Sequence, residues 1–197
     1  MTKAERTRQF IVEKTAPIFN MKGFAGTSLS DLTDATGLTK GSIYGNFANK
    51  DEVALAVFDY NVGRMNQGIK EAADSKTNAV EKLLKMADFH RCQFKTTAGR
   101  GGCPVLNTAI DSDDTHPQLK EKVAKSIKNW KKLIEKIISQ GVAKQEVNPG
   151  VNPAHFATEY ISLIEGGIML AKATGDMNML QIAIARVEKI IKTELTP

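Results

Sequence analysis

The chain has 197 residues, of which 42% are hydrophobic and 25% are charged, and its formal net charge is +5. This composition is typical of a globular protein of one or two domains and excludes a largely disordered chain. Only 6% of the residues are aromatic, while Ala, Leu, Ile, Lys and Glu are plentiful, so the sequence predicts an all-α fold. The N-terminus is charged and no run of about 18 uncharged apolar residues occurs, so we expect no membrane span and a cytoplasmic protein.

The N-terminal quarter combines positive charge with dense helix punctuation. Residues 1–50 contain seven Lys or Arg and four Asp or Glu, which is about +3 of the net charge. Three pairs of residues mark helix starts, because each places a capping oxygen three positions before a carboxylate. The pairs are Thr2 with Glu5, Ser28 with Asp31, and Asn49 with Glu52. Glycines that can end a helix follow, and the pattern predicts short helices over 2–21, 28–35 and 39–46.

Longer helices are predicted from residue 49 onward. Apolar residues recur at helical intervals over 49–73, from 78 to the glycine-rich stretch 97–104, and up to residue 141 in a helix that Thr115 and Gln118 would cap. Pro153 begins the next helix, Gly175 ends it, and a final helix runs to about Leu195. The last two helices are apolar on more than one face, so we expect one face in the core and another against a second chain.

Residues 28–47, SLSDLTDATGLTKGSIYGNF, form a helix-turn-helix pattern around Gly37. Five apolar residues can make a common core, and their burial turns the other face of the second helix outward. They are Leu29, Leu32, Ala35, Leu38 and Ile43. The outward face carries hydroxyls, an amide and a cation, which suit the bases and phosphates of a DNA groove. Gly41 keeps this helix thin, so its backbone can approach the duplex closely.

Residues 8–58 resemble the DNA-binding domain of the TetR family of bacterial transcriptional regulators. The resemblance rests on Phe19 and the KGF turn that follows it, a Thr-Ser start to the second helix, the segment TKGSIYGNF, and Lys50 at the start of the fourth helix. It implies groove-facing residues in the recognition segment and phosphate contacts from Thr27, Tyr44 and Lys50. The expected DNA-binding residues are Thr27, Ser28, Thr39, Lys40, Gly41, Ser42, Tyr44, Asn46 and Lys50. Phe47 is assigned to the core.

The resemblance also implies a DNA-binding domain at 1–48 and a larger helical domain at 49–197 that binds an effector and dimerises. The expected function is a homodimeric repressor that a small-molecule effector releases from near-palindromic double-stranded DNA. The last two helices would form a four-helix interface with a partner. Its expected residues are Tyr160, Leu163, Ile164, Gly167, Met169, Leu170, Ile184, Val187 and Ile191. Side chains suited to an apolar effector cavity are Met65, Met86, Phe89, Cys92, Cys103, Trp130 and Phe156.

The sequence offers little for other chemistry. Cys92 and Cys103 lack a zinc-ligand spacing, so we expect buried free thiols and neither a disulfide framework nor a metal site. No nucleophile–base pair, carboxylate pair or phosphate loop has convincing spacing, so we expect no cofactor and no enzyme. Two alternatives stay open, namely a helical small-molecule carrier or enzyme without DNA function, and an architectural DNA-binding protein that ignores ligands.

Overall fold

The computed structural model describes residues 1–97 and 101–197, and every regular element in these ranges is helical, which confirms the all-α expectation. The elements are α1 (Lys3–Gly26), α2 (Leu29–Thr36), α3 (Lys40–Tyr44), α4 (Lys50–Asp74), α5 (Ala79–Thr97), α6 (Pro104–Ser112), α7 (Pro117–Ala143), α8 (Pro153–Thr174), α9 (Met177–Ile190) and the π-helical turn η2 (Ile191–Leu195). Part of the predicted glycine-rich break, residues 98–100, lies outside the described residues. No helix in the described ranges is long and apolar enough to cross a bilayer.

The chain divides into two compact units that differ from the predicted domains. Unit 1 consists of residues 1–64 and the described part of 99–124, so it joins α1–α3 with α6. Unit 2 consists of the described part of 65–98 and of 125–197. Helices α4 and α7 each contribute residues to both units. The functional boundary at residue 48 stays a prediction, because a grouping by packing does not test where function divides.

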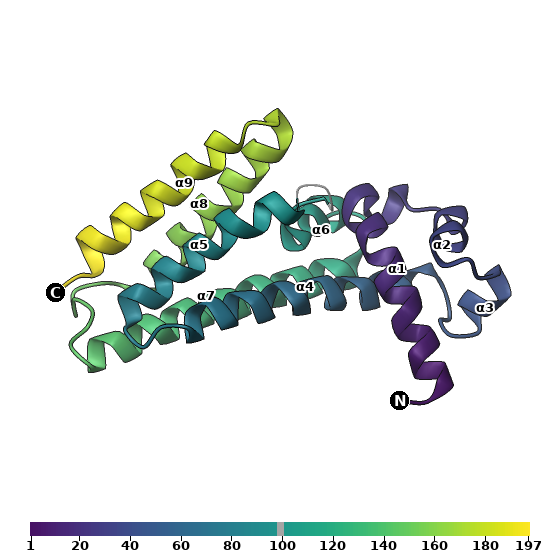
Figure 1. Cartoon of the computed structure of the whole chain (residues 1–197), viewed down its shortest axis with the longest axis horizontal. Helices are drawn as coiled ribbons and strands as arrows, with labels where there is room; N and C mark the ends of the chain where they lie inside the picture. Colours follow the sequence, from purple (N-terminus) through teal and green to yellow (C-terminus); the bar gives the residue numbers. More distant parts are fainter. Residues whose placement is uncertain (98–100) are drawn as a thin grey trace. The chain divides into compact units, whose positions relative to one another are not determined.

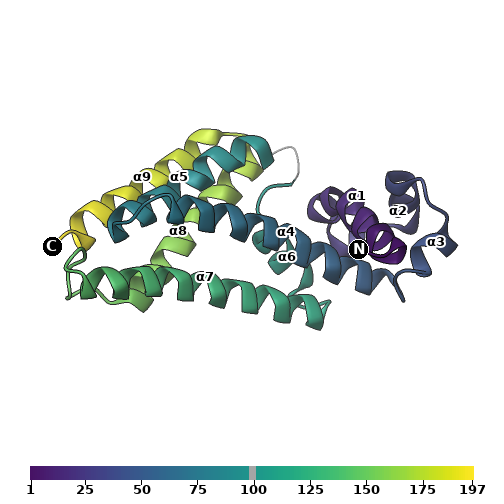
Figure 2. The same ribbon diagram turned by 60° about the horizontal axis from the view of Figure 1, so that its bottom comes forward.

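Unit 1 is built around a small apolar core. Ile11, Ile43 and Val53 are completely buried there, and so bring together α1, α3 and α4. Figure 2 shows α1, α2 and α3 gathered near the beginning of α4. The first helix is longer than predicted, and its backbone leaves helical geometry at Gly23, where φ is 72°. Only glycine adopts such a φ without strain, so this residue sets the direction of the last turn of α1.

Unit 2 is dominated by the antiparallel hairpin of α8 and α9, with α5 packed on it (Figure 1). Gly175, at a φ of 72°, ends α8 and reverses the chain. The two helices approach closely beside Gly167, where an added Cβ would lie 2.6 Å from the Cβ of Ala183. The hairpin thus buries its inner face against its own chain.

This packing buries six of the nine predicted interface residues within the chain itself. They lie in the core of unit 2, on the faces that α8 and α9 turn toward their own chain. They are Tyr160, Ile164, Gly167, Ile184, Val187 and Ile191. Leu163 is half-buried, whereas Met169 and Leu170 are exposed. Contact of these six residues with a second chain stays a prediction.

Candidate DNA interface

Local hydrogen bonds define the turn between α2 and α3. The Ser28 hydroxyl accepts from the Asp31 N–H, and the Asp31 carboxylate accepts from the Ser28 N–H, which makes the predicted capping box. Gly37 ends α2 in the left-handed conformation, with a φ of 66°. Thr39 then caps α3, since its hydroxyl accepts from the Ser42 N–H at 3.2 Å. These contacts lie within a few residues of one another, so the local sequence positions α3.

The outward side of α3 carries the first group of predicted DNA-binding residues. Thr39, Lys40, Gly41 and Ser42 are all exposed. The same short helix is anchored by Ile43, and the chain after it by Phe47, both of which are buried in unit 1. A Cβ added at Gly41 would meet nothing closer than 3.9 Å, at the Thr39 hydroxyl. The fold itself thus does not require glycine there, whereas a closely approaching duplex would.

Tyr44 and Asn46 are half-buried and partly used by the fold. Tyr44 packs against the core of unit 1. The Asn46 side chain donates to the Ser42 carbonyl at 2.9 Å, so it helps to cap the end of α3. The side-chain amide of Asn46 is therefore already hydrogen-bonded within the protein in the absence of DNA. DNA contact by these two residues stays a prediction.

Arg8 is a positioning residue that the sequence analysis missed. Its guanidinium lies 4.0 Å from the centre of the Phe47 ring, and donates to the Asn46 carbonyl and the Glu52 carboxylate. The Ala48 N–H and then Arg8 lower the pKa of Glu52. Arg8 stands one helical turn before the buried Val12, and this i, i+4 spacing is the signal that points to the inner side of α1. It joins α1 to the end of the recognition segment and the start of α4.

Lys50 also holds the fold together. Its ammonium donates to the carbonyls of Phe24 at 2.9 Å and Thr27 at 3.0 Å, and lies 4.3 Å from the centre of the Phe24 ring. Two of its three N–H groups are therefore hydrogen-bonded to carbonyls at the C-terminal end of α1. The phosphate contact expected of Lys50 stays a prediction that rests on one remaining N–H.

Thr27 does not reach solvent. Its side chain is 1% exposed, and its hydroxyl donates to the Gly23 carbonyl at 2.6 Å. In this structure the hydroxyl is buried and already hydrogen-bonded, so the expected phosphate contact stays a prediction. Ser28 is exposed beside it. The neighbouring Lys22 ammonium, at 2.6 Å, and then the Ser28 N–H lower the pKa of Asp31 to about 2.

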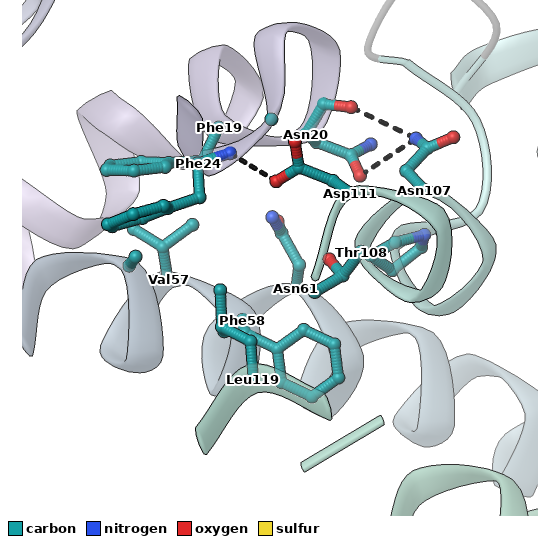
Figure 3. A pocket seen from close by; sticks show the side chains of 13 residues that line it. Phe19, Asn20, Phe24, Val57, Phe58, Asn61, Asn107, Thr108, Asp111 and Leu119 are labelled. Carbon is teal, nitrogen blue, oxygen red and sulfur yellow. Dashed lines mark hydrogen bonds between the residues drawn. The ribbon is translucent and has the colours of Figure 1, made fainter. Parts of the chain in front are cut away.

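A pocket in unit 1 was not anticipated from the sequence (Figure 3). It contains about 370 Å³ of empty space, open solvent included, between α1, α4, α6 and the start of α7. Asp111 accepts from the Phe24 N–H at 2.6 Å, and Asn107 donates to the Asn20 carbonyl at 3.0 Å. These two α6 side chains are one helical turn apart, so they share a face. They attach α6 to the last turns of α1.

The predicted effector-cavity residues have different environments. Cys103 belongs to unit 1, and the other six belong to unit 2. Met86, Trp130 and Phe156 are buried, and Phe156 lines with Tyr160 a shallow hollow with about 150 Å³ of empty space, open solvent included. Neither Cys92 nor Cys103 forms a disulfide, as expected, but Cys92 is exposed and only Cys103 is buried. The expectation of two buried thiols is therefore wrong for Cys92, and the cavity assignments stay predictions.

Two family models match successive parts of the chain. Residues 11–57 match a family model described as bacterial regulatory proteins of the tetR family. Residues 79–187 match one described as a tetracyclin repressor-like C-terminal domain. The structure is similar to that of a TetR-family transcriptional regulator from Cytophaga hutchinsonii, with 41% identity, a TM-score of 0.93, and coverage of 100% of this chain and 98% of that one.

Two further relatives are similar over nearly their whole length. A TetR transcriptional regulator from Chloroflexus aurantiacus is 35% identical, with a TM-score of 0.92 and coverage of 100% of this chain and 99% of that one. An uncharacterised HTH-type transcriptional regulator of Bacillus subtilis is 26% identical over 194 residues, which are 98% of each chain.

Proposed function

Because this chain belongs to the TetR family of bacterial transcriptional regulators, we propose that it is a homodimeric repressor that a small-molecule effector releases from its operator. The observation that carries the DNA contact is the exposed polar side of α3, from Thr39 to Ser42, above the buried Ile43. Two relatives, one from a Mycobacterium strain and one from Escherichia coli, are named transcriptional repressors. The chain would act in the cytoplasm and carry out no catalytic step.

The proposed dimer uses the outer side of the α8–α9 hairpin. Four large apolar side chains are exposed on α8 and α9, and a dimer that paired these two helices would remove them from water. They are Met169, Leu170, Met179 and Ile182. A two-fold axis would place a second copy of each residue opposite the same surface. Two recognition helices would then enter successive major grooves about 34–36 Å apart, so the operator would be a near-palindrome.

Helix α4 is the proposed lever for effector response. It runs without a break from Lys50 to Asp74, and its residues belong to both units. In unit 1 its first residue is bonded to the end of α1. An effector that favours another α4 position would lower the affinity for DNA, and DNA would lower the affinity for effector by the same factor.

The test is a mobility-shift titration with a duplex selected from a random pool by the full-length protein. We expect Lys40→Ala to weaken binding by about 1–3 kcal/mol if it contacts a base, or to reduce the salt slope by about one if it contacts a phosphate. Lys132→Ala is the matched control, because Lys132 is exposed on α7 in unit 2. Equal binding of selected and scrambled duplexes would favour an architectural DNA-binding protein, and no binding of either would favour a carrier or enzyme.

A further inference from the structure

Two buried polar groups lie side by side in unit 2. His90 on α5 and Trp130 on α7 are each 5% exposed, and their ring centres are 5.2 Å apart. Neither His90 Nε2 nor Trp130 Nε1 has a hydrogen-bond partner among the described residues. Buried polar groups in native proteins nearly always have partners, so a pair of exceptions requires an explanation.

The two rings do not satisfy each other. Their planes are inclined by only 32°, so the in-plane N–H of each ring runs roughly along the face of its neighbour and does not point into it. The surroundings are apolar, since Met86 precedes His90 by one turn, Ile134 follows Trp130 by one turn, and both are completely buried. A few polar groups in an apolar setting are the usual composition of a small-molecule site.

The charge of this region limits the class of ligand. Burial lowers the pKa of His90 to about 4, so the imidazole is neutral at physiological pH. The adjacent Arg91 does not supply a free cation, because its guanidinium donates to Asp88, Gln181 and Glu188. A buried anion without a cationic partner is strongly disfavoured. The charges around the two rings therefore favour a neutral ligand over a carboxylate.

We propose that His90 and Trp130 form the polar anchor of the effector site, and that the effector is a neutral, mainly apolar molecule with a phenolic or carbonyl oxygen. The oxygen accepts from the indole N–H of Trp130, and His90 Nε2 makes the second hydrogen bond. Ser126, which is buried one turn before Trp130 on α7, adds a hydroxyl on the same helix face. This inference rests on the proposed effector response, because it assigns a site and a chemistry to that ligand.

The test uses NMR of the full-length protein, because Trp130 is its only tryptophan and gives a single indole N–H signal. Phenol, toluene and benzoate are titrated separately at low millimolar concentration. Phenol and toluene have the same shape, so they differ in whether an oxygen is present. We expect phenol to shift the indole signal saturably and to bind at least about fivefold more tightly than toluene. Benzoate should not bind.

Variants separate the anchor from a plain apolar cavity. His90→Phe should weaken phenol about fivefold to tenfold, strengthen toluene, and leave the melting temperature unchanged or higher, because it removes an unpartnered polar group. His90→Gln keeps a polar nitrogen and should preserve the preference for phenol. His155→Phe is the matched control, because His155 is exposed on α8 in the same unit, and should change nothing.

Three results would overturn the anchor: no shift with phenol, toluene binding as tightly as phenol, or unchanged phenol affinity in His90→Phe. The mobility-shift assay distinguishes this failure from failure of the proposed function. If phenol binds as expected but the protein shows no sequence-specific DNA binding, the proposed anchor is supported and the proposed regulatory function is refuted. If the protein binds its selected duplex but phenol leaves the indole signal unchanged, the regulatory function is supported and the anchor is refuted.

Discussion

Lys50→Met decides between two roles for the lysine at the start of α4. Its ammonium donates to the carbonyls of Phe24 and Thr27 and lies over the Phe24 ring. Methionine keeps a long apolar side chain and removes the charge and the donors. If the role is internal, the substitution should loosen the attachment of α4 to the last turn of α1. If the role is a phosphate contact, it should change only DNA binding.

The expected loss of stability follows from the contacts. A hydrogen bond to a charged group contributes about 1.5–3 kcal/mol, and an exposed cation–π contact about 0.5–1 kcal/mol. Lys50 is half-buried, so water can hydrate the two carbonyls in the variant. This hydration offsets part of the free energy lost with the hydrogen bonds. We therefore expect a net loss of about 1–3 kcal/mol. In a chain of this length each 1 kcal/mol lowers the melting temperature by about 2–4 °C, which predicts a decrease of about 2–12 °C.

The assay combines thermal unfolding, followed by circular dichroism, with the salt dependence of DNA binding. Lys40→Met is the control, because Lys40 is exposed on α3 and should lose DNA affinity without a change in melting temperature. The reasoning would be refuted if Lys50→Met melted within about 1 °C of the wild type and reduced the salt slope by about 0.9, the value for one phosphate contact.

Three further predictions concern the two units. Gly23→Ala should destabilise by about 1–3 kcal/mol in urea, because φ is 72° and the new Cβ would lie 2.5 Å from Asp111 Oδ1; an unchanged urea midpoint would contradict this. Asp31→Asn should lower stability above the ordinary carboxylate pKa of 3.8, and the difference should shrink as pH falls from 3.8 through the folded pKa of about 2; a difference that does not shrink over this range would show another cause. Ile182→Glu should convert a dimer to a monomer in sedimentation velocity with little change in melting, because Ile182 is 60% exposed, and an intact dimer would remove this residue from the interface.

Features that depend on neighbours in the chain were predictable from the sequence. The capping boxes at Thr2 and Ser28 are present, and Asn49 accepts from the Glu52 N–H as expected. Their capping atoms are only three residues apart, so backbone geometry brings them together whatever the rest of the fold does. The start of α7 differs from the prediction that Thr115 caps it. There the Leu119 N–H donates to His116 Nδ1. The helix-turn-helix and its exposed residues from Thr39 to Ser42 follow from such local patterns.

The environment of each side chain was decided by tertiary packing. The apolar pattern of α8 and α9 could not tell which residues face their own core, since both sides of each helix are apolar, and only the hairpin places Ile184 inside and Ile182 outside. The sequence motif indicated a phosphate contact for Lys50, and only the fold showed that its ammonium also bonds carbonyls 26 and 23 residues earlier in the chain. His90 and Trp130 are 40 residues apart, and only the packing of α5 against α7 makes them neighbours. Local sequence was enough to place the helices and the helix-turn-helix, because caps and turns depend on near neighbours in the chain. Burial and long-range pairing depend on the whole chain, so they became known only from the packed structure.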